Sequence, residues 1–359
     1  MSRRRVTFPH MGEYWIAFET LVELLGAQAV VPPRMTRHTL EAGAHVSPEF
    51  VCVPFKYNMG NFLEALEGGI DVIVQAGGGC RFGYYGEVQE AILRDMGYDF
   101  DLVNLVETTN LPMLVRELRR IQPGASYPRA VKAFLIAYRQ AQAIEAVEDF
   151  VRKNVGFAVD RGAIDRVTAR FLRELRGART LRAVRDLRST TLAALGAIPL
   201  AKPENPLRVG VVGELYVLME PFANHNIERR LAESGVEVHR FVTLTSLIEH
   251  GLAGRTFVRK TIAAAGPWLE FHLGADATES VAKTWELMNE GFDGMVHVKP
   301  FGCMPEVSAM SVLQRISREY TFPIMFMSYD AQTAEAGVDT RVEAFCDMLQ
   351  MRRRRQSGA

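Results

Sequence analysis

The sequence predicts an α/β protein in which two parallel-sheet units are joined by a helical section. Three observations predict this fold. Short apolar runs alternate with helical patterns in the first third of the chain, the alternation resumes in the last third, and strand patterns are absent between about residues 111 and 200. Strands that alternate with helices are typical of a mostly parallel sheet covered on both faces. We expect an N-terminal α/β lobe over 1–110, a helical section over 111–203 and a C-terminal α/β lobe over 204–359.

In the N-terminal lobe, short apolar runs predict strands. They are RVTF (5–8), QAVVPP (28–33), EFVCVPF (49–55), DVIVQA (71–76) and DFDLVNLV (99–106). Three stretches carry apolar residues at helical spacing with a glycine near the end, which predicts helices between these strands. They are residues 13–26, 59–69 and 85–97.

The middle of the chain reads as long amphipathic helices over 128–154 and 165–195. Residues 197–208 contain three prolines and are typical of a linker. In the C-terminal lobe, the same criteria predict a helix over 226–235 and four strands. The strands are RVGVVGE (208–214), VEVHRFV (236–242), DGMVHVKPF (293–301) and PIMFMSY (323–329).

Charge and hydropathy limit the kinds of partner and the location that we expect for this protein. The 359 residues include 42 basic and 42 acidic ones, so the net charge does not favour nucleic acid or an anionic membrane as a partner. No apolar stretch reaches the roughly 18–20 residues of a membrane helix. The opening MSRRRVTFPHMG lacks the apolar core of a signal peptide. We therefore expect a cytoplasmic protein that binds neither membrane nor nucleic acid.

Three of the four cysteines fall at or near the ends of predicted strands: Cys52, Cys80 and Cys303. Ligands of open α/β sheets bind at the carboxyl ends of the strands. Cys80 and Cys303 also precede predicted helices, whose N-termini favour a thiolate. The fourth, Cys346, shares one helix face with apolar residues, so we expect it to be a core residue.

The spacing of the cysteines limits the metal that they can hold. Paired CxxC units and an HExxH motif are absent, which argues against zinc. Iron–sulfur clusters accept cysteines from scattered loops. Three cysteines on a [4Fe–4S] cluster would leave one iron open to water or substrate, and Gly78 and Gly79 would let backbone N–H groups approach the cluster. Buried thiols beside structural turns remain the alternative.

Other residues are candidates for binding. Cys80 is followed by Arg81, Tyr84 and Tyr85. These side chains could line a pocket, in which Arg81 would bind a carboxylate or phosphate, or they could equally pack against the turn. Gly302 immediately precedes Cys303 and is a further candidate for contact with the cofactor.

Glu214 follows a predicted strand and is a candidate general acid or base. His10 and Lys56 lie near predicted strand ends and are candidates for the cluster pocket, although a surface or hydrogen-bonded histidine is the plainer interpretation of His10. The VGVVGE stretch lacks GxGxxG, which argues against NAD or FAD. Thr340 and Glu343 have the spacing of a helix capping box.

Five stretches in order resemble the 2-hydroxyacyl-CoA dehydratase family, in its branch of stand-alone proteins related to the CoA-substrate-specific activases. They are VTFPHMG (6–12), SPEFVCVPFKYNMGNFLEALEGG (47–69), GGGCRFGYYGEVQ (77–89), HVKPFGCMPEV (297–307) and YDAQTAEAGVDTRVEAF (329–345). The resemblance covers about residues 6 to 350 and also extends to the benzoyl-CoA reductase branch of the superfamily.

The resemblance implies two Rossmann-like lobes and a [4Fe–4S] cluster held by Cys52, Cys80 and Cys303. It also implies a separate ATP-hydrolysing activase that delivers one electron, which permits loss of water from a 2-hydroxyacyl-CoA under anaerobic conditions. Relatives act as two unlike subunits, so we expect a homologous second subunit or a homodimer.

Two features depart from the family pattern. Close relatives read GGCGPCRFGYY where this chain reads GGGCRFGYY, and the single cysteine argues against a larger cluster. A GxxxxGK[ST] loop is absent, so ATP hydrolysis would need a separate activase. The alternatives are a low-potential reductase of another small substrate, a non-catalytic iron–sulfur component for electron transfer or scaffolding, and a metal-free binding protein.

Overall fold

The computed structural model describes residues 3–76, 84–105 and 110–356 and confirms the α/β class. The chain divides into two compact units. Unit 1 comprises Met1–Ile144, Leu172–Leu187 and Leu244–Gly254, and unit 2 comprises Glu145–Phe171, Arg188–Thr243 and Arg255–Ala359. Each unit holds one four-stranded, all-parallel sheet, as in a Rossmann-like lobe.

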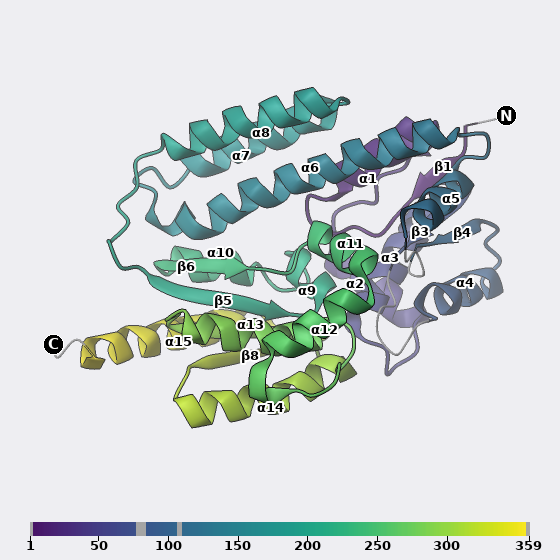
Figure 1. Ribbon diagram of the computed structural model, residues 1–359. Helices are drawn as coiled ribbons and strands as arrows, with labels where there is room; N and C mark the ends of the chain where they lie inside the picture. The colour runs from purple at the N-terminus through teal and green to yellow at the C-terminus, as the bar shows by residue number, and fades with distance from the viewer. Residues whose placement is uncertain (1–2, 77–83, 106–109, 357–359) are drawn as a thin grey trace. The chain divides into compact units, whose positions relative to one another are not determined.

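The sheet of unit 1 has the strand order β2-β1-β3-β4, and Figure 1 labels its strands β1, β3 and β4. Its strands are β1 (Arg5–Thr7), β2 (Gln28–Ala29), β3 (Val72–Gln75) and β4 (Asp101–Asn104). The helices of this unit are α1 (Trp15–Leu25), α2 (Arg37–Val46), α3 (Val53–Glu67), α4 (Tyr85–Asp95), α5 (Leu111–Ile121) and α11 (Leu244–Ala253). Apolar side chains of α3 and α4 pack with Ile73 of β3 in one core cluster, which covers a face of the sheet.

The strand predicted over residues 49–55 is wrong, because α3 begins at Val53. Pro54 fits the first turn of a helix, where no N–H group is needed, and its fixed φ angle favours that position. Phe55, Met59 and Phe62 then recur at helical spacing in the buried core. The sequence analysis also missed α2, which packs closely against α3.

Three long helices contribute residues to both units: α6 (Tyr127–Asn154), α7 (Ala163–Gly177) and α8 (Leu181–Gly196). The single helix predicted over 165–195 is therefore two helices. Gly177 ends α7, and the Thr180 hydroxyl accepts a hydrogen bond from the Ala183 N–H at 3.1 Å, which caps the start of α8.

The sheet of unit 2 has the strand order β6-β5-β7-β8. In both sheets, the second strand along the chain is an edge strand that pairs with the first. Its strands are β5 (Leu207–Gly213), β6 (Val236–Arg240), β7 (Gly294–Pro300) and β8 (Ile324–Tyr329). The chain adds β6 on one side of β5 and then returns to add β7 on the other side. Open α/β folds bind ligands at the carboxyl ends of a strand pair where the order reverses in this way.

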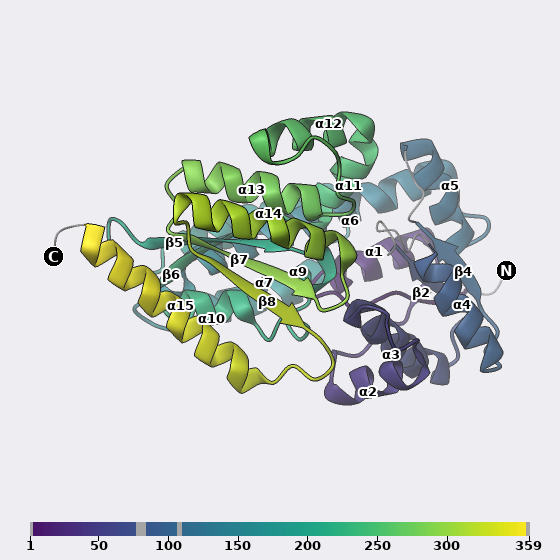
Figure 2. The same cartoon turned by 90° about the horizontal axis from the view of Figure 1, so that it is seen from below.

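Helices cover both faces of this sheet, with α13 and α14 on one side and α10 and α15 on the other (Figure 2). The helices of unit 2 are α9 (Leu215–Met219), α10 (Ile227–Glu233), α12 (Arg255–Ala264), α13 (Ala277–Asn289), α14 (Met304–Tyr320) and α15 (Glu335–Gln356), with 3-10 turns η1 (Val155–Phe157) and η2 (Gly266–Trp268).

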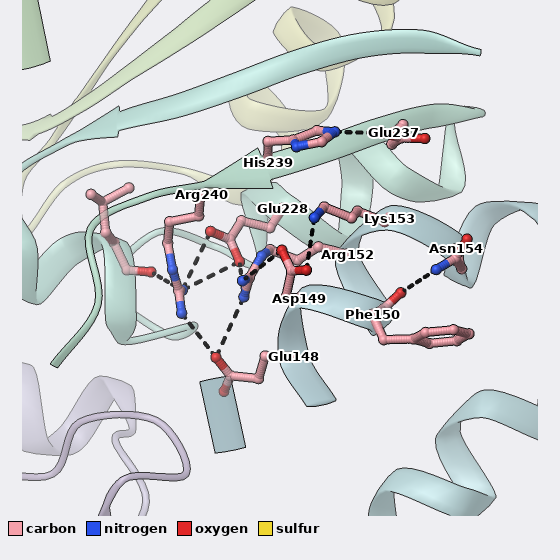
Figure 3. Close-up of polar contacts among 11 residues, drawn as sticks. Glu148, Asp149, Phe150, Arg152, Lys153, Asn154, Glu228, Glu237, His239 and Arg240 are labelled. Atoms are coloured by element: carbon pink, nitrogen blue, oxygen red, sulfur yellow. Dashed lines mark hydrogen bonds and ion pairs between the residues drawn. The ribbon is translucent and has the colours of Figure 1, made fainter. Parts of the chain in front are cut away.

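A buried ion network joins β6 to α10 and to the last part of α6 (Figure 3). Arg240 of β6 contacts Glu148 of α6 at 2.8 Å and Glu228 of α10 at 3.3 Å. Arg152 contacts the same two carboxylates at 3.5 and 3.7 Å. The two guanidinium groups are buried, so each depends on the paired carboxylates to offset its lost hydration.

Two expectations for the C-terminal helix have different outcomes. Cys346 is buried with Val342 and Leu349, as predicted, and burial raises the pKa of its thiol to about 11. The capping box at Thr340 is wrong, because α15 begins at Glu335 and the Thr340 hydroxyl donates to the Ala336 carbonyl inside the helix. Among the described residues, no helix combines the length and apolar character needed to cross a membrane.

Candidate functional site

Cys303 lies directly beyond β7, as predicted. Its N–H donates to the Pro300 carbonyl at 3.2 Å, which closes a tight turn that contains the exposed Gly302. Cys303 is the N-cap residue of α14, and Pro305 occupies the second helical position. The strand therefore delivers the cysteine to the carboxyl end of the sheet, and the turn fixes its backbone.

Cys52 is also an N-cap residue, although no strand precedes it. Pro54 occupies the second position of α3, and the Cys52 sulfur lies 3.5 Å from the Tyr85 hydroxyl of α4. Tyr85 also contacts the Phe55 ring edge-on, with 5.0 Å between centroids. Of the two tyrosines noted in the sequence, Tyr85 is thus buried beside Cys52, whereas Tyr84 is 75% exposed.

The two units therefore present cysteine in the same local setting, a Cys-x-Pro sequence at the start of a helix. Neither thiol caps its own helix by a hydrogen bond. Both residues are partly exposed. The N-terminus of a helix carries partial positive charge, which stabilises an anionic thiolate ligand. A partly exposed thiolate of this kind is the ligand type that iron–sulfur clusters take.

Four further predicted site residues come from one stretch of the sequence. Cys80, Gly78, Gly79 and Arg81 lie outside the described residues. Within 3–76, 84–105 and 110–356, no three or more His, Cys, Asp or Glu side chains form a group that could hold a metal ion. The three-cysteine ligand set therefore stays a prediction.

Glu214 is held at the carboxyl end of β5. Its N–H donates to the Val298 carbonyl of β7 at 3.0 Å, and its carboxylate accepts from the N–H groups of Tyr216 at 3.1 Å and Val217 at 2.9 Å. Gly213 has φ = 139°, and a Cβ atom there would lie 1.7 Å from the Val298 oxygen. Only glycine allows this close approach, so Gly213 fixes the position of Glu214.

A second carboxylate joins Glu214 at the start of α9. Asp276 accepts the Leu215 N–H at 3.2 Å, so three consecutive N–H groups are shared by two carboxyl groups. Burial raises the pKa of Glu214 to about 7. The two N–H bonds lower this pKa, and the charge of Glu306 adds to the increase. Burial also raises the pKa of Asp276 well above its usual range, with Glu306 and Glu214 adding to the effect.

Glu306 connects this pair to β7 and α14. It lies in the first turn of α14, and its Oε2 is 2.7 Å from Nε2 of His297 on β7, with both side chains fully buried. The Ser280 hydroxyl donates to its other oxygen at 3.3 Å. Lys299 follows His297 on the same face of β7. Burial lowers the pKa of Lys299, and the charges of Cys303 and Glu306 act in the opposite direction.

Sequence reasoning identified Glu214 here but missed Asp276, His297, Lys299 and Glu306. Two signals were present. His297 and Lys299 place polar side chains on one face of a strand that is otherwise apolar, and Glu306 stands three residues after an N-cap cysteine. The partner of each residue depends on long-range folding, so the pattern alone does not identify it.

The remaining predicted residues lie in unit 1. His10 is buried, and its backbone N–H donates to the Asn61 side-chain oxygen at 3.1 Å. Lys56 lies on α3, and its Nζ donates to the Glu49 carbonyl at 3.3 Å. Neither contact assigns chemistry to these residues, and their predicted roles stay predictions.

No family model matches this chain, and a search of the curated proteins finds no match.

Proposed function

We propose that this protein is a cytoplasmic iron–sulfur enzyme of the 2-hydroxyacyl-CoA dehydratase type, with a [4Fe–4S] cluster held by Cys52, Cys80 and Cys303. The observation that carries the proposal is the repeated Cys-x-Pro helix start in two units whose sheets share one strand order. The five family-like stretches in the sequence support the same assignment. The partners would be an ATP-dependent activase, an acyl-CoA and either a homologous second subunit or a second copy of the chain.

When bound, the cluster supplies low-potential one-electron chemistry, primed by the activase. The residues of unit 2 supply the proton. A hydroxyl group leaves more readily when it accepts a proton, and an acid with a pKa near the working pH is the best donor. The Glu214 carboxyl, with its pKa of about 7, is partly protonated at neutral pH. Lys299 contributes a cation beside Cys303, which favours the thiolate.

The first experiment measures iron and acid-labile sulfide per chain on anaerobically purified protein. We expect roughly four of each for a [4Fe–4S] cluster. Cys52→Ala, Cys80→Ala and Cys303→Ala should each lose or destabilise the cluster, whereas Cys346→Ala is the matched control because this buried thiol lies on the core face of α15. Absence of iron and sulfide after anaerobic reconstitution, or an equal loss in Cys346→Ala, would refute the proposed cofactor.

The second experiment tests the reaction. The loaded protein is mixed with a competent activase, ATP, a strong reductant and a panel of 2-hydroxyacyl-CoA thioesters, and formation of the enoyl-CoA is followed. Turnover that depends on the activase, on ATP and on the reductant supports dehydration. A loaded cluster without turnover on any thioester would instead favour an electron-transfer component or a reductase of another small substrate.

A further inference from the structure

A shallow apolar groove lies on unit 1, between the first turns of α6 and the start of α8. Its volume is about 450 Å³. The groove is lined by Tyr127, Pro128, Val131, Lys132, Leu135 and Leu181. Tyr127, Leu135 and Leu181 are 54%, 42% and 47% exposed, which is unusual for three large apolar side chains that share one depression.

The rim of this groove is basic. Residues 127–144 of α6 contain no acidic residue; Lys132 lines the groove, and Arg139 lies four residues beyond Leu135 on the same helix face. The Arg119 guanidinium stacks over the Tyr127 ring, 4.0 Å from its centroid. At the start of α8, residues 181–187 add two exposed arginines against one aspartate. A local positive field therefore surrounds an apolar floor, although the whole chain carries no net charge.

We propose that this groove docks an acidic amphipathic helix of a partner protein. The groove-lining residues of α6 run from Tyr127 to Leu135, which corresponds to about 12 Å along a helix axis. That length matches the apolar anchors of a partner helix at positions i, i+3 or i+4, and i+7. Acidic residues on either side of those anchors would face the basic rim, which favours this partner over a basic one.

A helix explains the groove better than the two other classes of anionic partner. Nucleic acid needs basic groups spread along its phosphates, and an apolar floor gives it nothing to bind except through stacking. A membrane surface favours a convex apolar face with basic flanks. Here the apolar residues lie in a depression, so a side chain that projects from a helix fits them best.

The test uses the full chain and a fluorescein-labelled synthetic peptide of about 18 residues, with leucines along one helical stripe and glutamates elsewhere. A second peptide has the same composition, but its leucines are spread around the helix. Binding is measured by fluorescence anisotropy at low and high salt. Phosphatidylglycerol vesicles and a duplex DNA serve as alternative probes.

We expect saturable binding of the striped peptide, at least roughly tenfold weaker binding of the scrambled one, and weaker binding at high salt. Leu135→Glu places a carboxylate on the groove floor and should weaken binding by roughly tenfold or more. Met348→Glu is the matched control, because Met348 is 44% exposed on α15 of unit 2 and receives the same charge. Both sites are exposed, so thermal unfolding should show that both variants fold.

Three results would overturn the proposal. They are no saturable binding of the striped peptide, binding that Leu135→Glu and Met348→Glu affect equally, and tighter, Leu135-dependent binding of vesicles or DNA than of the peptide. The measurement does not depend on a bound cluster, so its failure would leave the proposed enzymatic function untouched, and the reverse also holds.

Discussion

Replacing Glu214 by glutamine is expected to change how the stability of the protein depends on pH. The pKa of Glu214 is raised from 4.5 to about 7 by burial. Between these two values the folded state keeps a proton on this carboxyl that the unfolded state has released. The favourable contribution of Glu214 to folding is therefore complete below about pH 4.5 and is lost as the pH rises through about 7.

The difference between the two pKa values corresponds to about 3 kcal/mol, since one pKa unit is worth about 1.4 kcal/mol. Glutamine cannot ionise, so the Glu214→Gln variant should gain up to about 3 kcal/mol relative to the wild type between pH 4.5 and pH 8. A separate loss of about 1 kcal/mol is expected at every pH, because the glutamine amide has one accepting oxygen where the two oxygens of the Glu214 carboxyl group each accept an N–H bond.

The assay is denaturant unfolding at several pH values between 4.5 and 8, followed by tryptophan fluorescence, since Trp268 and Trp285 report on unit 2. Glu343→Gln is the control, because Glu343 is an exposed carboxylate on α15 of the same unit. The informative quantity is the stability difference between variant and wild type at each pH. A difference that stays constant across the range would refute the raised pKa and, with it, the role of Glu214 as a proton donor at neutral pH.

Three further substitutions have expected outcomes, each measured by thermal or denaturant unfolding. Arg240→Met should destabilise the protein by about 3 kcal/mol, because Glu148 and Glu228 lose the nearer of their two shared cations and keep only Arg152; a loss below about 1 kcal/mol would mean that the network is hydrated. Gly60→Ala should cost roughly 1–3 kcal/mol or more, since its Cβ would lie 1.9 Å from the Thr39 carbonyl oxygen where α2 and α3 meet; an unchanged midpoint would contradict this close contact. Cys303→Ser, measured without iron, should raise the stability of the protein by up to about 1 kcal/mol, because serine is a better N-cap. Cys346→Ser should lower the stability, because it buries a hydroxyl group among apolar side chains.

The sequence was sufficient for the parts of the fold that local pattern determines. Short apolar runs that alternate with helical segments identified both sheets. Buried parallel strands such as Val72–Gln75 and Gly294–Pro300 are runs of this kind, followed by turn residues. The same pattern failed at residues 49–55, where Val51, Val53 and Phe55 favour a strand locally but α3 packing in the core selects a helix.

The candidate site was less predictable for a physical reason. Glu214 could be found because it follows an apolar strand directly. Asp276 and Glu306 reach the same place from α13 and α14, which are far from β5 in the sequence. The raised pKa of Glu214 depends on its burial and on the neighbouring charge of Glu306. Neither quantity exists until the chain has folded.

Cysteine stands at the start of two helices, a position that other residues cap better. N-cap positions favour serine, threonine, aspartate or asparagine, because their side chains accept a hydrogen bond from the first turn. Cys52 and Cys303 make no such bond, so each helix forgoes about 1 kcal/mol that a better cap would supply. Proline in the first turn, where it presets the helical φ, limits this loss in both helices. The stability of the fold does not account for cysteine at both helix starts, whereas the proposed role as thiolate ligands would account for it.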